Sequence, residues 1–423
     1  MARKLFGTDG VRGVAGEVLT AELALALGRA ASEELRSDHA PQVLIIRDTR
    51  ESGEMLEAAF AAGVTSAGGD VLLGGVLPTP AAPLLIARYG FDIAVVISAS
   101  HNPYRDNGIK LFGPDGNKLA DDIELNIEAR MERTEHPVPD RIGRVRALHG
   151  TLEDYLRELQ TRFGELDLSG VNVLLDCANG ATFRAAPEIF RRLGATVATI
   201  ADQPDGRNIN DGVGSTHVEA LGKAVAEGGH DLGFAFDGDE LIAIAALHLR
   251  EAGRLPGDGV VVTVMTNYGF HVAMEQAGLD IAVTGVGDRY VLEELRNRGW
   301  ALGGEQSGHI IDMGFNATGD GTASALLTLE ALAGADLAER KGMEKLPQRL
   351  VNVPVPDRDA AMTSPDLAKA TDEANAALAG RGRVLVRPSG TEQLVRVMVE
   401  APTAEEADSV CNDLVALVQA TSA

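Results

Sequence analysis

The chain is poor in cysteine and in aromatic residues. Two cysteines in 423 residues, Cys177 and Cys411, provide no disulfide framework and favour a reducing compartment. Aromatic residues make up 4% of the chain and hydrophobic residues of all kinds 45%, so any core must be built mainly from aliphatic side chains. These two shortages exclude a small disulfide-stapled scaffold and leave hydrophobic packing as the source of stability.

Basic residues and long apolar runs are also scarce. The chain has 38 Lys and Arg against 62 Asp and Glu, a net charge of −24, which argues against nonspecific nucleic-acid binding. A negatively charged substrate therefore needs a local cluster of cations and backbone amides. No apolar run is long enough to span a membrane, and the start MARKLFGTDG lacks the apolar stretch of a signal peptide. We expect a cytoplasmic protein without nucleic-acid or membrane partners.

The order of strand and helix patterns predicts an α/β protein of several domains. Apolar strand patterns at 43–46, 71–76 and 93–97 alternate with helical patterns at 19–35 and 55–66, which is typical of parallel α/β units. The same alternation returns twice, and the polar stretch 134–146 is typical of a linker. We therefore expect three similar α/β domains and a smaller C-terminal α+β domain, covering residues 1–150, 151–252, 253–345 and 346–423.

The fourth domain has a different order of elements, βαββα. Ser364 followed by Pro365 predicts the start of one helix, with serine as the N-cap and proline at the first helical position. Thr403 and Glu406 have the spacing of a capping box, which predicts the start of the last helix. Strand patterns at 351–355, 383–388 and 394–401 complete this domain.

A polar loop follows the most apolar strand pattern of the first domain. Residues 93–97, IAVVI, predict a strand buried on both faces, and SASHNPYRDNG follows with residues typical of a loop. Ser100 therefore lies where a buried strand ends, which is where open α/β sheets bind their ligands. The alternative is a serine that only caps a turn.

Two further loops have polar residues at similar density. In FDGDE, Asp237 and Asp239 follow an apolar strand pattern, and such oxygen ligands suit Mg²⁺, although an Asp-Gly turn is the simpler reading of this pair alone. In GEQSGH, Glu305 and Ser307 can hydrogen-bond sugar hydroxyls or an amine. His309 can act as an acid or base, or it can be structural.

The loop RPSGTE, residues 387–392, offers groups that bind phosphate. Ser389, Gly390 and Thr391 provide hydroxyls and backbone N–H groups, and consecutive N–H groups in a turn can cradle an anion. Arg387 and the nearby Arg396 provide forked donors that match phosphate oxygens. The alternative is a plain β-turn flanked by solvated arginines.

Together and in this order, the motifs resemble those of the α-D-phosphohexomutases over nearly the whole chain. They are FGTDGVRG (6–13), ISASHNPYRDNGIKLF (97–112), AFDGD (235–239), GVGDRY (285–290), GGEQSGH (303–309) and RPSGTE (387–392). The start KLFGTDGVRG, the double-serine form ISASHN, LDCANGA (175–181) and GSTH (214–217) resemble the bacterial phosphoglucosamine mutases of that superfamily. The resemblance implies four domains with mixed sheets around a central cleft, and a possible homodimer.

The resemblance also implies an activity and a mechanism. The expected reaction interconverts glucosamine 6-phosphate and glucosamine 1-phosphate and feeds the synthesis of UDP-N-acetylglucosamine for cell-wall precursors. Ser100 is expected to carry a phosphoryl group, to give it to the sugar phosphate and to recover the other phosphate from a bisphosphate intermediate. One Mg²⁺, held by Ser100, Asp237 and Asp239, and a sugar 1,6-bisphosphate activator are implied as cofactors.

The resemblance assigns the other candidate residues to the substrate. Arg12 and Lys110 are expected around the acceptor hydroxyl, and Lys110 or His309 can transfer its proton. Sugar and phosphate contacts are expected from three groups of residues: Glu305 with Ser307; Gly287, Asp288 and Arg289; and Arg387, Ser389, Gly390, Thr391 and Arg396. Two alternatives stay open, namely a homologue with weakened catalysis that binds sugar phosphates, and a phosphoglucomutase or phosphomannomutase.

The metal loop departs from the family pattern. That pattern is D-G-D-x-D-R, but here Asp239 is followed by Glu240, Leu241 and Ile242, and the segment after them also differs. We interpret this run of changes as a local frameshift, a sequencing error, an engineered change or a natural loss of activity. It predicts weaker Mg²⁺ binding, while Gln393 in place of the usual proline after SGTE removes no ligand.

Overall fold

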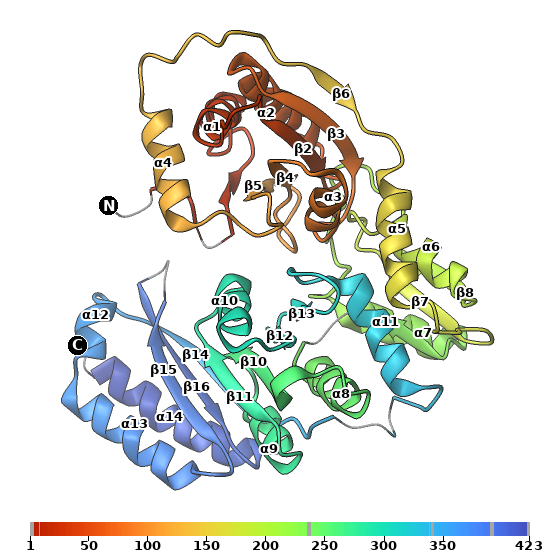
Figure 1. Ribbon diagram of the computed structural model, residues 1–423. Helices are drawn as coiled ribbons and strands as arrows, with labels where there is room; N and C mark the ends of the chain where they lie inside the picture. The colour runs from red at the N-terminus through yellow and green to blue at the C-terminus, as the bar shows by residue number, and fades with distance from the viewer. Residues whose placement is uncertain are drawn as a thin grey trace.

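The computed structural model describes residues 4–7, 9–234, 238–337, 339, 342–389 and 393–420. Figure 1 shows four α/β regions that follow one another around an arc, with the N-terminal region at the top and the C-terminal region at the lower left. Within the described residues, no helix is both long and apolar enough to cross a membrane.

The first domain is built on a six-stranded mixed sheet with the order β1-β5-β4-β2-β3-β6. All five residues of β4 are buried, as the IAVVI pattern predicts, and β4 pairs in parallel with β2 and antiparallel with β5. The end of the predicted linker adds the edge strand β6. The elements are β1 (Val11–Val14), α1 (Ala21–Glu34), β2 (Gln42–Arg47), α2 (Ser52–Ser66), β3 (Asp70–Val76), α3 (Ala81–Tyr89), β4 (Ile93–Ile97), β5 (Asp106–Phe112), α4 (Asp121–Met131) and β6 (Val145–Ala147).

Two smaller sheets follow. The second has the order β8-β7-β9, and its described strands are parallel. Its elements are α5 (Thr151–Arg162), β7 (Asn172–Asp176), α6 (Ala185–Arg192), β8 (Thr196–Ile200), α7 (Val218–Gly228) and β9 (Leu232–Phe234). The third sheet is mixed, with the order β11-β10-β12-β13. Its elements are α8 (Gly238–Glu251), a 3₁₀ turn (Pro256–Asp258), β10 (Gly259–Thr263), α9 (Tyr268–Gln276), β11 (Asp280–Thr284), α10 (Asp288–Arg298), β12 (Leu302–Gly304), β13 (Ile310–Asp312) and α11 (Gly321–Leu332).

The fourth domain is an antiparallel sheet, β14-β16-β15, backed by helices. The hydroxyl oxygen of Ser364 accepts from the backbone N–H of Leu367, and that of Thr403 accepts from Glu406, so both predicted helix caps are confirmed. A short helix is present in addition to the predicted order. The elements are β14 (Gln348–Pro354), α12 (Arg358–Met362), α13 (Pro365–Leu378), β15 (Arg383–Pro388), β16 (Leu394–Glu400) and α14 (Ala404–Ala420).

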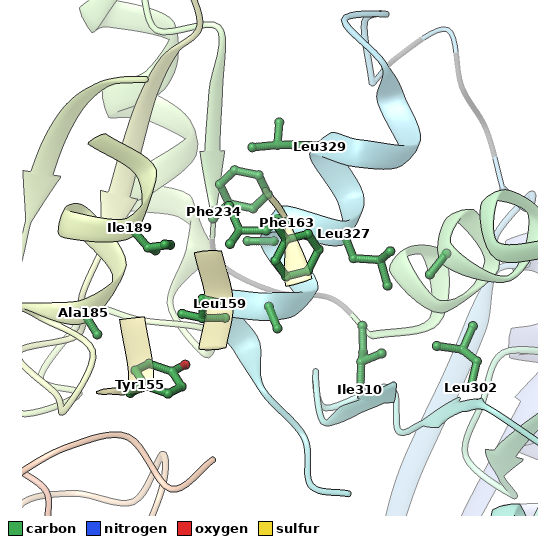
Figure 2. Close-up of a cluster of buried hydrophobic side chains, with 14 of the residues drawn as sticks. Tyr155, Leu159, Phe163, Ala185, Ile189, Phe234, Leu302, Ile310, Leu327 and Leu329 are labelled. Carbon is green, nitrogen blue, oxygen red and sulfur yellow. The ribbon is translucent and has the colours of Figure 1, made fainter. Parts of the chain in front are cut away.

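One aliphatic core runs through the first three domains and fixes them to one another. Helix α5 packs against α3 and α6, and its Leu159, with Phe163 directly after the helix, belongs to the same buried core as Leu327 of α11 (Figure 2). The hydroxyl of Tyr155 donates to the carboxylate of Asp320 at 2.9 Å inside this core. Because the core is continuous, these domains can hold side chains from different sheets at one site.

The segment after the expected metal loop is a helix that belongs to the third sheet. Residues 238–251 form α8, which packs against α9, α11 and β12. Ile242, Ala246 and Leu249 are almost fully buried and follow helical spacing. Ala243, Ile244 and Ala245 between them are buried as well, so neighbouring elements enclose the helix on several sides, and its burial does not distinguish between the four interpretations of this segment. The expected domain boundary at residue 252 separates α8 from the elements on which it packs.

The pair α1 and α2 provides a test of the packing. A Cβ atom at Gly63 would lie 2.1 Å from the carbonyl oxygen of Leu25, whereas one at Gly222 on exposed α7 would meet nothing within 4 Å. We expect Gly63→Ala to lower the free energy of unfolding by about 1–3 kcal/mol through overpacking. Gly222→Ala should leave it unchanged or raise it by up to about 1 kcal/mol. Urea unfolding of both variants checks this, and equal midpoints would contradict it.

Candidate active site

Ser100 lies in a strained backbone conformation just after β4. Its φ angle is 55°, in the left-handed region that non-glycine residues rarely adopt. Its backbone N–H donates to the hydroxyl oxygen of Ser98 at 3.2 Å. Such a conformation persists only where surrounding contacts enforce it, and it is often found at functional sites.

A buried arginine, Arg50, binds the backbone of this loop. Arg50 is 0% exposed, and its guanidinium donates to the carbonyl oxygens of Ser100 and Asn102, both at 2.9 Å, and to further carbonyls of the same loop. Asp48 accepts from its Nε at 2.9 Å and balances its charge. Arg50 was not among the predicted site residues. The available signal was a charged RDTR stretch directly after the apolar strand pattern VLII.

The second domain contributes another clamp to the same carbonyls. The side-chain amide of Asn210 donates to the carbonyl oxygens of Ser100 at 2.9 Å and of Asn102 at 3.0 Å. Asn210 itself has a φ of 59°, so two left-handed residues from different domains meet here. The loop of Ser100 is therefore fixed by both the first and the second domain. Asn210 was also missed, because it lies 110 residues away in sequence.

Ser100 opens onto a cavity of about 260 Å³ between three domains. The structure brings together at this cavity the predicted Ser100, Ser307 and His309. The lining is completed by His101, Ala178, Thr182, Asn210, Ser215, Gly308, Gly319 and Gly321. Burial lowers the pKa of His309, so its imidazole is neutral at pH 7 and able to accept a proton.

Arg12, Lys110 and Lys118 gather around the carboxylate of Asp9. The Lys110 ammonium lies 2.8 Å from Asp9, the Lys118 ammonium lies 2.5 Å from it, and the Arg12 guanidinium donates to it. Burial alone would raise the pKa of Asp9, but the three cations outweigh it and hold this pKa well below its usual range. Burial lowers the pKa of Lys110, against the opposing effect of Asp9. The predicted pair Arg12 and Lys110 is therefore present, together with Asp9 and Lys118, which were not predicted.

Lys118 also joins this cluster to the predicted sugar loop of the third domain. Its ammonium lies 2.7 Å from a carboxylate oxygen of Asp288, and both residues line a second cavity, of about 530 Å³. The backbone N–H of Gly287 donates to Glu305 at 2.9 Å, so two predicted sugar-binding motifs are linked. Burial raises the pKa of Glu305. Arg289 instead reaches across to the first domain and pairs with Asp121.

The predicted phosphate loop lies at one end of β15 and β16. Arg387 and Arg396 are direct partners in the antiparallel ladder, and burial together with the charge of Arg396 lowers the pKa of Arg387. Ser389 is 2% exposed, and Arg358 of α12 donates to its carbonyl oxygen. Two guanidinium groups side by side are stabilised by an anion between them. Gly390 and Thr391 lie outside the described residues.

The predicted metal ligands are not brought together in the described part of the chain. Asp237 lies outside the described residues. Asp239 is 3% exposed, and its Oδ2 accepts from the backbone N–H of Asn267 at 2.8 Å. Of the described residues that line the Ser100 cavity, none carries a carboxylate. Nor do the described residues include a group of three or more His, Cys, Asp or Glu side chains able to hold a metal. They therefore do not fit Mg²⁺, which binds through one or two carboxylates.

Comparisons with known proteins show which sequences this chain is similar to. The models for phosphoglucomutase/phosphomannomutase alpha/beta/alpha domains I and III match residues 3–137 and 237–352, and the model for the C-terminal domain matches residues 350–417. The phosphoglucosamine mutase of Moorella thermoacetica is 50% identical over 433 residues, covering 96% of this chain and 97% of that protein. That of Mycolicibacterium paratuberculosis is 48% identical over 441 residues, covering 99% of each.

The fold is shared with solved structures at lower identity. A phosphoglucomutase/phosphomannomutase family protein of Burkholderia thailandensis superimposes with a TM-score of 0.79 at 23% identity, covering 100% of this chain and 98% of that one. The N-acetylphosphoglucosamine mutase of Aspergillus fumigatus, in complex with GlcNAc-6P and magnesium, has a TM-score of 0.71 at 18% identity, covering 100% and 96%.

The clamp on the Ser100 loop can be tested with Arg50→Lys. A single ammonium cannot replace the planar fork that binds several carbonyls at once. We expect the free energy of unfolding to fall by about 1–3 kcal/mol, because buried acceptors are left unpaired. Amide hydrogen exchange in residues 98–108 should also accelerate. Arg133→Lys, at an exposed position, is the matched control. Unchanged exchange and stability in the Arg50 variant would show that the loop does not depend on this contact.

Proposed function

Because the chain belongs to the phosphoglucomutase/phosphomannomutase family, we propose that it interconverts glucosamine 6-phosphate and glucosamine 1-phosphate through a phosphorylated Ser100. The position of Ser100 supports this function best: a strained serine, clamped by two domains, opens onto a cavity shared with Ser307 and His309. The bacterial relatives that are about half identical to this chain are phosphoglucosamine mutases, and their similarity extends over nearly the whole chain.

Two balanced transfers complete the reaction. In the first, the bond between phosphorus and Ser100 Oγ breaks as phosphorus bonds to the free sugar hydroxyl, and that hydroxyl gives its proton to the neutral imidazole of His309. In the second, the bisphosphate has turned over in the site. The phosphorus–oxygen bond at the other end of the sugar breaks, the phosphoryl group returns to Ser100 Oγ, and the proton returns to the freed oxygen. A sugar 1,6-bisphosphate loads Ser100 before the first cycle.

The side chains of this chain supply charge and orientation for both transfers. Phosphoryl transfer is accelerated chiefly by positioning and by neutralising the negative charge of the transferred group. Arg12 and Lys110 provide positive charge in the first domain, and Asp9 keeps the two side chains aligned before substrate arrives. Sugar hydroxyls are proposed to bind Glu305, Ser307 and the loop Gly287–Arg289. The phosphate at the far end is proposed to bind Arg387, Ser389, Gly390, Thr391 and Arg396.

A second candidate function is binding of sugar phosphates with weakened catalysis. The altered sequence after Asp239 and the burial of that residue in the third domain favour it. The two candidates differ in turnover rather than in binding. Relative rates on glucosamine, glucose and mannose phosphates also distinguish a phosphoglucosamine mutase from a phosphoglucomutase or phosphomannomutase.

Replacing the proposed nucleophile should abolish turnover. We expect Ser100→Ala to lower the rate on glucosamine 6-phosphate by about 10³-fold or more, because no group remains to carry the phosphoryl. Incubation with glucose 1,6-bisphosphate should add a phosphoryl group to the unaltered chain, but not to this variant, in intact-mass spectrometry. Ser215→Ala, which alters another hydroxyl at the same cavity, is the matched control. Phosphorylation that persists in the Ser100 variant would contradict the proposal.

Lys118 should matter for substrate binding through the two carboxylates that it joins. Lys118→Met leaves Asp9 and Asp288 facing each other without the cation between them. We expect kcat/KM to fall about 10–100-fold, mostly through KM, because the sugar loop loses its tie to the first domain. Lys118→Arg should recover part of the loss. Lys369→Met, at an exposed surface pair, should change nothing. An unaltered KM in Lys118→Met would refute this role.

A further inference from the structure

The connection between β9 and α8 is very short. Strand β9 ends at Phe234 and α8 begins at Gly238, so three residues link the second sheet to the third domain. Helix α8 packs against α9, α11 and β12, and its buried residues include Ile242, Ala246 and Leu249. Asp239 is in the first turn of this packed helix. Its side chain is 3% exposed in that position.

Asp239 caps the start of the neighbouring helix α9. Its Oδ2 accepts from the backbone N–H of Asn267 at 2.8 Å. Asn267 is the N-cap of α9, and its own side-chain oxygen accepts from Gly269 at 3.0 Å and from Leu346 at 2.9 Å. Leu346 lies where the chain leaves the third domain and enters the fourth. The Asp239 carboxylate therefore supports the junction of these two domains.

The same junction contains a buried ion pair of the fourth domain. Glu400 is 0% exposed and accepts from the backbone N–H of Tyr268 at 2.9 Å and from the Nε of Arg383 at 2.7 Å. Arg383 also donates to the carbonyl oxygen of Thr266 at 2.5 Å. The segment Thr266–Tyr268 is thus held by Asp239 on one side and by Glu400 and Arg383 on the other. Buried polar groups of this kind are costly to leave unpaired, so each partner is needed.

Unlike the surroundings of Asp239, the described lining of the Ser100 cavity contains no carboxylate. In the first domain, Arg12 and Lys110 both pair with the carboxylate of Asp9. Asp9 is already surrounded by cations. In the described part of the cavity lining, oxygen ligands come from serine and threonine hydroxyls and the amide of Asn210. Mg²⁺ sites in proteins normally need at least one carboxylate.

The length of the chain also indicates that residues have been lost relative to its relatives. The alignment with the Mycolicibacterium paratuberculosis protein is 441 residues long, which exceeds the 423 residues of this chain by 18. This chain therefore lacks at least that many residues that lie within the relative. The short β9–α8 connection, in sequence that departs from the metal-loop pattern, is a place where such a loss fits.

We propose that Asp239 caps the junction of the third and fourth domains and is not a magnesium ligand, and that the described residues, 235–237 being outside them, form no two-carboxylate Mg²⁺ site. This assignment replaces the expectation that Asp237 and Asp239 bind the metal together. It does not depend on turnover of sugar phosphates. Positive charge in the first domain is then supplied by Arg12 and Lys110.

Two measurements on the full chain test this assignment without using catalysis. Titration calorimetry with MgCl₂ alone gives metal affinity, and amide hydrogen exchange of peptides covering residues 266–270 reports on the junction. In Asp239→Asn, exchange at the junction should accelerate several-fold as the charged cap is lost, while Mg²⁺ affinity changes by less than about twofold. Glu240→Gln, an exposed carboxylate in the same helical turn, should change neither.

Loss of a true ligand would give the opposite result. A fall in Mg²⁺ affinity of about tenfold or more in Asp239→Asn, as metal sites show when a supporting group is lost, would overturn the proposal. If that variant does not fold, Asp239→Ser keeps a short oxygen acceptor for the backbone N–H of Asn267 while it removes the carboxylate. Exchange at the junction and Mg²⁺ affinity should then both stay close to those of the unaltered chain, and a fall in Mg²⁺ affinity of about tenfold or more would overturn the proposal. Absence of mutase turnover would count against the proposed function and not against this assignment.

Discussion

The buried guanidinium of Arg50 is the contact on which the candidate site depends. The loop after β4 turns several carbonyl oxygens inward, and in a protein interior such acceptors are expensive to leave without partners. Arg50 satisfies them as a group, and Asp48 balances its charge where water is excluded. Ser100 can then keep a left-handed conformation that its own side chain does not favour. Asn210 adds a second domain to the same anchor.

Local pattern was enough to predict the elements that carry the site but not the contacts that hold it. The IAVVI run and the loop residues after it identified Ser100, and the fourth domain's caps at Ser364 and Thr403 followed from side-chain chemistry next to the helix. Arg50 and Asn210 were missed because each acts on a loop 50 or more residues away. Their side chains give no periodic signal, so only the fold reveals what they bind.

The segment after Asp239 shows how a motif can obscure a periodic pattern. Compared with the D-G-D-x-D-R pattern, the residues from Glu240 onward appeared as a run of changes. Considered by themselves, Ile242, Ala246 and Leu249 have the three- and four-residue spacing of a helix, and the structure forms this helix and buries them, together with the residues 243–245 between them. The helical spacing was in the sequence throughout. A carboxylate that matches a ligand position can still serve a helix end.

The pair β15 and β16 has a mechanical consequence. One end of this ladder is anchored to the third domain through Arg383 and Glu400, and the other end carries Arg387 and Arg396, four residues further along. Four residues of strand make an arm of about 13 Å. If both strands rotate together by about 10° at the anchored end, the two guanidinium groups move by about 2 Å, because the arm is about 13 Å long. A small rotation about the Arg383–Glu400 ion pair therefore produces a larger displacement of Arg387 and Arg396 at the other end of the ladder.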